Sequence, residues 1–102
     1  MGAERKRTQR RRAENAARKL VREREKLARL EAGGARDRPM EVVSSSVIPV
    51  RARAQPCPQC QGALHILDER AESAELRAVD VECQRCGARR VLWFRIAPPR
   101  MN

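Results

Sequence analysis

Two Cys-x-x-Cys pairs set the strongest constraint on what this chain can fold into. Two residues between cysteines place both sulfurs on one side of a tight turn, and two such turns supply the four thiolates of a tetrahedral zinc site. The 22 residues between the pairs, 61–82, are enough for two strands and a hairpin. The spacing therefore predicts one structural zinc ion held by Cys57, Cys60, Cys83 and Cys86.

A redox role is the alternative for these cysteines. It would have to account for two redundant pairs, and the redox motif usually opens a helix in a βαβ context that this sequence lacks. Turn-forming residues accompany both pairs, namely Pro58, Gly62 and Gly87. Thiols stay reduced inside cells, where paired motifs favour metal over disulfides. A site closed by four cysteines contributes folding energy and leaves no coordination position for a substrate.

Residues 57–96 resemble the zinc-ribbon family, with CPQCQG and CQRCG as the two knuckles. The resemblance implies that the knuckles are joined by a β-hairpin and followed by a third strand. ALHILDER (63–70) and LRAVDVE (76–82) fit the hairpin, and ARRVLWFRI (88–96) is the strongest strand candidate. Zinc ribbons occur in transcription factors, RNA polymerase subunits, ribosomal proteins, topoisomerases and protein adaptors. The resemblance therefore indicates a fold and says little about function.

The first knuckle departs from the family pattern at one position. It has Gln61 where many ribbons place glycine, and Gly62 follows directly. We expect Gly62 to take over the role of that glycine, at some cost in turn geometry.

The residues ahead of the cysteines predict a long helix and then a hinge. Residues 3–32 contain no Pro or Gly and are dominated by good helix formers, and Gly33 and Gly34 supply a stop. In the segment that follows the hinge, β-branched pairs predict an additional strand, which Pro49 restricts to an edge or a bulge. We assign residues 1–32 to a basic helix, 33–39 to the hinge, 40–96 to a zinc-ribbon domain with a leading extended segment, and 97–102 to a disordered tail.

The expected fold is therefore a small zinc-stapled β domain preceded by a long basic α-helix. Its sheet would be three-stranded and antiparallel, with the extra N-terminal strand added. The chain has two aromatic residues, Trp93 and Phe94, among its 102 residues. So small a core needs an additional stabilising cross-link, which a metal ion bound by the four cysteines would supply.

The net charge of +10 belongs almost wholly to the N-terminal segment. Residues 1–38 hold 14 Lys or Arg and 6 Asp or Glu, a net of +8, whereas residues 39–102 hold 9 and 7, a net of +2. This asymmetry indicates a polyanionic partner, with DNA or RNA the first candidate. The arginine excess suits bidentate phosphate contacts, although codon bias in a GC-rich genome would produce it equally well.

Our main functional hypothesis is a nucleic-acid-binding protein whose helix contacts phosphates. The scarcity of aromatic residues argues against recognition by base stacking, so we expect binding to be mostly independent of sequence. The first turns of the helix should fray in isolation and become ordered on a polyanion. The candidate contacts are Arg5, Lys6, Arg7, Arg10, Arg11 and Arg12 in the helix, and Arg85, Arg89, Arg90 and Arg95 on or after the second knuckle.

The alternative hypothesis is an accessory protein that docks on a ribosome or an RNA polymerase. Leu20, Leu27 and Leu30 form an imperfect apolar stripe on the predicted helix. The stripe could contact a partner, pack on the ribbon, or self-associate as a short coiled coil. Trp93 and Phe94 face opposite sides of a strand, so one can fill the core while the other needs cover from residues 40–53 or from a partner. Trp93 is the candidate for a protein contact. The simplest interpretation of the basic residues in the N-terminal helix is that they only increase solubility.

Nothing in the sequence indicates an enzyme. His65, the single histidine, is most simply a half-exposed strand residue, and no Ser/His/Asp arrangement or phosphate-binding Gly loop is present. The N-terminus lacks the apolar region of a secretory signal, and the longest apolar run, residues 91–94, is too short to span a bilayer. We expect a cytoplasmic protein, with the nucleoid and the ribosome as two candidate places of association.

The carboxylates around the hairpin tip are interpreted as a solvated loop: Asp68, Glu69, Glu72 and Glu75.

Overall fold

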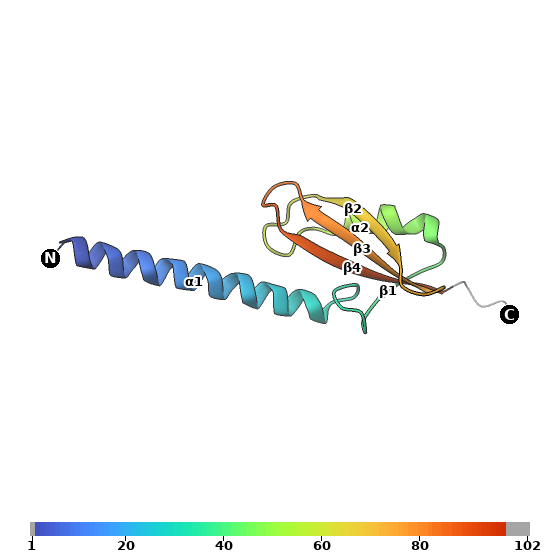
Figure 1. Ribbon diagram of the computed structural model, residues 1–102, viewed down its shortest axis with the longest axis horizontal. Helices are drawn as coiled ribbons and strands as arrows, with labels where there is room; N and C mark the ends of the chain where they lie inside the picture. The colour runs from blue at the N-terminus through green and yellow to red at the C-terminus, as the bar shows by residue number, and fades with distance from the viewer. Residues whose placement is uncertain (1, 98–102) are drawn as a thin grey trace.

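The computed structural model describes residues 2–97, with side chains from residue 5 onward, and places a long helix beside a small mixed sheet (Figure 1). The sheet has the strand order β1-β4-β3-β2. Within the sheet, β3 pairs antiparallel with both β2 and β4, and β1 pairs parallel with β4. The elements are α1 (Gly2–Leu30), β1 (Met40–Val42), a 3₁₀ turn η1 (Ser45–Val47), α2 (Ile48–Ala54), β2 (Leu64–Ala71), β3 (Leu76–Cys83) and β4 (Arg89–Ile96).

α1 confirms the predicted helix and ends at Leu30, two residues before the predicted end at residue 32. Arg38 donates to the Leu30 carbonyl at 3.1 Å, which satisfies one of the acceptors left open at the end of a helix. Gly33 follows with φ of +85°, a conformation that favours glycine. The Gly33 carbonyl accepts from the Trp93 amide at 2.8 Å. The hinge is therefore attached to the part of β4 that the short strand β1 leaves uncovered, where the backbone would otherwise form an open sheet edge.

The hairpin and the third strand lie where the sequence predicts them. Leu64 pairs with Cys83 across β2 and β3, and Val79 pairs with Leu92 across β3 and β4. A register shift interrupts the first ladder between Ile66 and Asp68. The hairpin brings the C-terminal end of β3 beside the start of β2, so the two cysteine pairs meet at the same end of the sheet. The predicted tail lies largely outside the described residues.

The leading segment is only partly extended, which corrects the prediction of an extended segment after the hinge. β1 is the additional strand, but it is limited to three residues and is followed by η1 and α2. Pro49 occupies the first turn of α2, where the missing amide hydrogen costs no helical hydrogen bond. Ile48 and Ala52 are both fully buried. Their spacing of four residues is the helical signal that the β-branched composition obscured.

The core lies between α2 and one face of the sheet. Phe94, Val79 and Val81 are fully buried there, together with Ile48 and Ala52 of α2. Burial of a side chain such as Phe94 stabilises a fold by about 1.5–3 kcal/mol. Trp93 faces the opposite side of β4 and is half-buried, with the Arg36 guanidinium 5.8 Å from its ring centroid. Its cover comes from the hinge, whereas we expected it from residues 40–53 or from a partner.

Candidate metal centre

The four cysteines form one cluster at the end of the sheet. Their Sγ atoms all lie within 4.8 Å of one another, with Cys57 and Cys86 separated by 3.7 Å and Cys60 and Cys83 by 3.4 Å. Sulfurs bound tetrahedrally at 2.3 Å from a zinc ion would be about 3.8 Å apart. Cys57 and Cys83 are buried, and Cys86 is exposed. The cluster can therefore hold one metal ion, as the spacing predicted.

The two turns that carry the cysteines repeat the same backbone hydrogen bonds. In the first knuckle, the Cys57 amide donates to the Gly62 carbonyl at 3.0 Å and the Gln61 amide donates to the Cys57 carbonyl at 2.7 Å. In the second, the Cys83 amide donates to Ala88 at 2.9 Å and the Gly87 amide donates to Cys83 at 3.0 Å. These equivalent bonds fix both knuckles in one geometry. Residues 26 positions apart therefore play matching roles.

Gln61 itself adopts the left-handed conformation, with φ of 65°, as Gly87 does at the matching position with φ of 76°. The prediction that Gly62 takes over this role is therefore wrong. Gly62 is required for space, because a Cβ there would lie 2.9 Å from the Cys83 Sγ and 3.2 Å from the Cys60 Sγ. The sulfur cluster thus occupies the volume that any side chain at this position would need.

Backbone amides favour the thiolate form in the second knuckle. The amides of Cys86 and Arg85 lie 3.4 and 3.3 Å from the Cys83 Sγ, and the Cys86 hydrogen bond is the largest cause lowering the pKa of Cys83 to about 6. The Ala88 amide lowers the pKa of Cys86, but burial and hydrogen bonds with the other thiols outweigh it and raise that pKa to about 11. Four thiols so close together resist full ionisation, and a divalent cation would remove that resistance.

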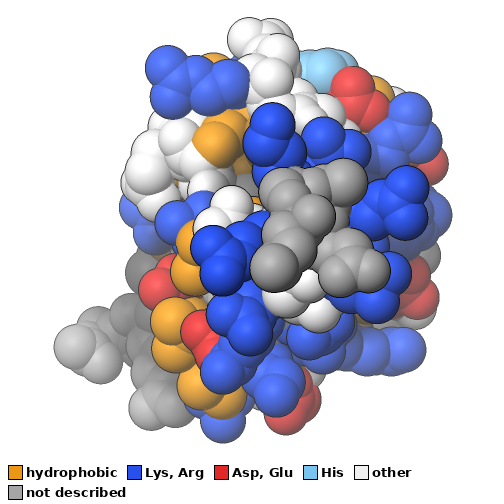
Figure 2. All heavy atoms as spheres, turned by 90° about the vertical axis from the view of Figure 1, so that its left-hand side faces the viewer, with side chains coloured by type: hydrophobic (Ala, Val, Ile, Leu, Met, Phe, Trp, Pro, Cys, Tyr) orange, Lys and Arg blue, Asp and Glu red, His pale blue; other side chains and the backbone are white. Residues whose placement is uncertain are grey.

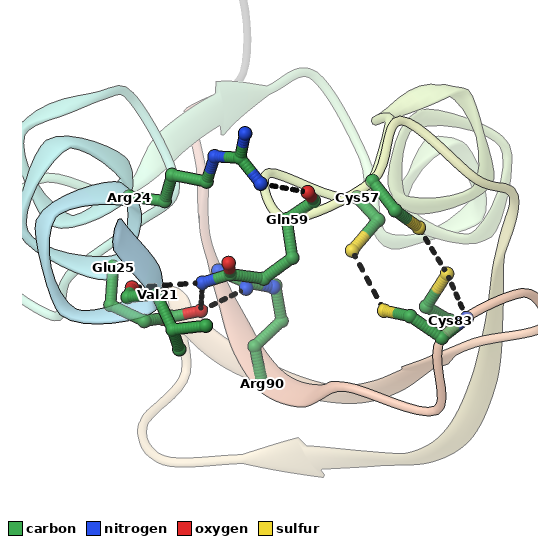
Figure 3. Close-up of polar contacts among 9 residues, drawn as sticks. Val21, Arg24, Glu25, Cys57, Gln59, Cys83 and Arg90 are labelled. Carbon is green, nitrogen blue, oxygen red and sulfur yellow. Dashed lines mark hydrogen bonds and ion pairs between the residues drawn. The ribbon is translucent and has the colours of Figure 1, made fainter. Parts of the chain in front are cut away.

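α1 is joined to the first knuckle through Gln59, which lies between Cys57 and Cys60 (Figure 3). The Gln59 amide nitrogen donates to the Val21 carbonyl at 3.1 Å and to the Glu25 carboxylate at 2.8 Å. Arg24 donates to the Gln59 carbonyl at 2.7 Å. One residue of the metal-binding turn therefore holds two successive turns of the helix.

An ion pair completes this attachment. Arg90 of β4 donates to the Glu25 carboxylate at 2.5 Å, and the Arg90 side chain is only 9% exposed. Burial raises the pKa of Glu25, but the hydrogen bonds from Gln59 and Arg90 and the positive charge of Arg90 outweigh it, so the pKa is lowered overall. We refer to Arg24, Glu25, Gln59 and Arg90 as the docking cluster.

The apolar contact between α1 and the domain is small. Ala28 is buried at 8% exposure, whereas Leu20, Leu27 and Leu30 are 45%, 62% and 59% exposed. A cavity of about 330 Å³ remains beside the docking cluster, lined in part by Ala28 and Pro58. The predicted leucine stripe therefore does not pack on the domain, and polar contacts hold the helix.

The structure divides the predicted nucleic-acid contacts into two groups. All six basic residues at positions 5–12 are exposed, and Lys and Arg side chains are prominent when the molecule is viewed from the N-terminal end of α1 (Figure 2). We refer to residues 5–12 as the basic tip.

The predicted contacts after the second knuckle are engaged within the protein. Arg89 pairs with Glu82 at 2.6 Å, and Arg95 pairs with Glu41 at 2.7 Å. Arg85 lies 3.4 Å from the Cys60 carbonyl, and Arg90 belongs to the docking cluster. The burial of Arg90 was foreseeable, because it shares its strand face with Leu92 and Phe94.

Comparisons with protein-family models, with curated proteins and with solved structures find no match to this chain. Among the described residues, no helix is both long enough and apolar enough to cross a membrane.

Proposed function

We propose that this chain is a non-catalytic zinc-binding protein that binds nucleic acid through the basic tip of α1. The observation that supports the proposal most directly is the position of the tip. In Figure 1 the N-terminal half of α1 extends well beyond the sheet, and the molecule measures 74 × 23 × 20 Å along its principal axes. The positive charge is thus presented at the end of a rod, away from the compensating acidic residues of the domain.

The chemistry of the donor set supports zinc in the cysteine cluster. Zinc prefers four thiolates in closed structural sites. The two matched knuckles, the hairpin and the third strand fit a zinc ribbon, to which this chain adds β1 and α2. When bound, zinc would contribute folding free energy to a domain with a thin core. We therefore assign the ion a structural role and the domain the role of a rigid base for α1.

The distribution of charge pairs supports nucleic acid as the partner. On the sheet, Arg89 and Arg95 each have an acidic partner. In the basic tip, six Lys or Arg residues occur within eight positions, and Glu4 is the one acidic residue among the first 12 positions. Such a cluster repels itself until a polyanion neutralises it. Phosphate contacts would release counterions and make binding strongly dependent on salt.

Fluorescence anisotropy with a labelled duplex at several salt concentrations tests the proposal. If all six basic residues contact phosphates, log K should fall against log salt with a slope of about −5. Replacement of all six by glutamine should abolish most of this dependence, while circular dichroism verifies that the helix persists. A flat salt dependence of the wild-type protein would refute the proposal.

A second candidate function is favoured by the exposed leucines of α1. Leu20, Leu27 and Leu30 present apolar surface that the domain leaves uncovered, which suits an accessory protein docking on a ribosome or RNA polymerase. An apolar interface survives high salt, whereas phosphate contacts are lost. Retention on purified ribosomes or polymerase at 1 M salt, and its loss in Leu27→Glu, would favour this second function.

A further inference from the structure

We infer that the basic tip binds inside the major groove of double-stranded DNA, with phosphates on more than one side of the helix. This inference rests on the proposed function and deepens it by naming the class of nucleic acid. It is derived from the directions in which the six basic side chains leave the axis of α1.

The six basic side chains form three pairs around the helix axis. Successive residues of an α-helix are about 100° apart, so residues four or seven apart lie on nearly the same side. The three resulting directions are about 120° from one another, and all six side chains are exposed. The pairs are Arg5 with Arg12, Lys6 with Arg10, and Arg7 with Arg11.

This arrangement does not match a flat anionic surface. A helix lying on a membrane buries one apolar face and directs its basic residues to the other, but residues 5–12 contain no apolar residue. On any flat polyanion only one or two of the three pairs could make contact. Charges on all sides are neutralised only by a partner that surrounds the helix.

The dimensions favour B-form DNA over the other nucleic acids. An α-helix with its side chains is about 10–12 Å wide, and the major groove of B-DNA is about 12 Å wide and about 8.5 Å deep. The major groove of A-form RNA is deep and narrow. Single strands are usually held by stacking on aromatic residues, and this chain has only Trp93 and Phe94, both in β4.

The structure also gives the tip enough reach to enter a groove. Of the contacts in the docking cluster, the one nearest the tip is at Val21, and a helix rises about 1.5 Å per residue. Residues 5–20 therefore extend about 24 Å beyond the docked turn.

Three double variants test the arrangement: R5Q/R12Q, K6Q/R10Q and R7Q/R11Q. Each removes two charges from one side of α1 and retains good helix formers. The matched control is R51Q/R53Q, because both residues are exposed on α2 in the domain. The probes are a labelled 16-bp DNA duplex, one of its strands, and an RNA duplex of the same sequence. Methyl green and netropsin serve as competitors for the major and the minor groove.

We expect at least two of the three variants to weaken duplex DNA binding about tenfold at moderate salt, each with a loss of about 2 in the salt slope. The control should bind as the wild type does, the single strand and RNA duplex should bind at least tenfold more weakly than duplex DNA, and methyl green alone should compete. The inference is overturned if only one pair matters, if single strands or RNA bind as tightly, or if netropsin competes instead. In those cases a steep salt dependence would leave the proposed function standing, whereas no binding to any probe would refute both.

Discussion

The Glu25 carboxylate of α1 lies 2.5 Å from the Arg90 guanidinium of β4, although the two residues are 65 positions apart in the sequence. Gln59, from the turn between Cys57 and Cys60, donates to the same carboxylate at 2.8 Å. The helix is thus fixed to the sheet and to the metal-binding turn at one point. Because little apolar surface supports it there, the direction of α1 depends on these polar contacts.

Glu25→Ala should destabilise the protein by about 1–3 kcal/mol. Loss of the carboxylate leaves the nearly buried Arg90 without its partner, and removing one member of a buried pair costs about 3–5 kcal/mol. We expect less because the Glu25 side chain is one-third exposed. Urea unfolding measures the change, with Glu23→Ala as the control. Glu23 forms an exposed pair with Lys19 at 3.9 Å, so its loss should cost about 0.5 kcal/mol or less. Equal effects of the two variants would contradict the docking role of Glu25.

Gln59→Ala should loosen the attachment of α1 to the domain while the sheet stays intact. The variant removes both side-chain hydrogen bonds from Gln59 to the helix. It leaves the Glu25–Arg90 pair and the hydrogen bond from Arg24 to the backbone carbonyl of residue 59. Backbone amides in residues 25–30 should then exchange with solvent faster, and the β3 amides should be unaffected. Arg85→Ala is the matched control, because Arg85 occupies the equivalent position of the second knuckle and lies outside the docking cluster. Unchanged exchange in Gln59→Ala would show that other contacts orient the helix.

Gly62→Ala should weaken metal binding, whereas Gly87→Ala should mainly lower the stability of the fold. A Cβ at Gly62 would lie 2.9 Å from the Cys83 Sγ, whereas a Cβ at Gly87 meets nothing within 4 Å. We therefore expect Gly62→Ala to weaken zinc binding about 10- to 100-fold, as disturbance around a metal site typically does. Gly87→Ala should mainly cost about 1–2 kcal/mol of backbone strain, because its φ is 76°. Competition with a chromogenic chelator gives the affinity, and a greater loss in Gly87→Ala would contradict this assignment.

Gln61→Gly should stabilise the domain slightly. Gln61 has φ of 65°, and relief of a left-handed conformation gains about 1–2 kcal/mol, against about 0.5–1 kcal/mol lost to the greater freedom of glycine in the unfolded chain. The net gain should be about 0.5 kcal/mol, seen as a rise in Tm at saturating zinc. A fall in Tm would mean that the Gln61 side chain stabilises the knuckle by more than its strain costs.

The features that could be predicted from the sequence are those with local signals. The cysteine spacing predicted the cluster, the zinc-ribbon resemblance predicted β2 to β4, and composition predicted α1. α2 was missed because β-branched residues outweighed the four-residue spacing of Ile48 and Ala52. The docking cluster was missed because it joins residues that are far apart in the sequence. Nothing in the local sequence indicates that Gln59 contacts residues 21 and 25 of the helix.

Native mass spectrometry of the purified chain, before and after treatment with a strong chelator, tests the central claim that Cys57, Cys60, Cys83 and Cys86 hold one structural zinc ion. We predict one zinc per chain, loss of the ion in Cys83→Ser, and collapse of the β-sheet signal in circular dichroism when the ion is removed. A chain that carries no stoichiometric metal, with a sheet that is unchanged by chelation, would contradict the account.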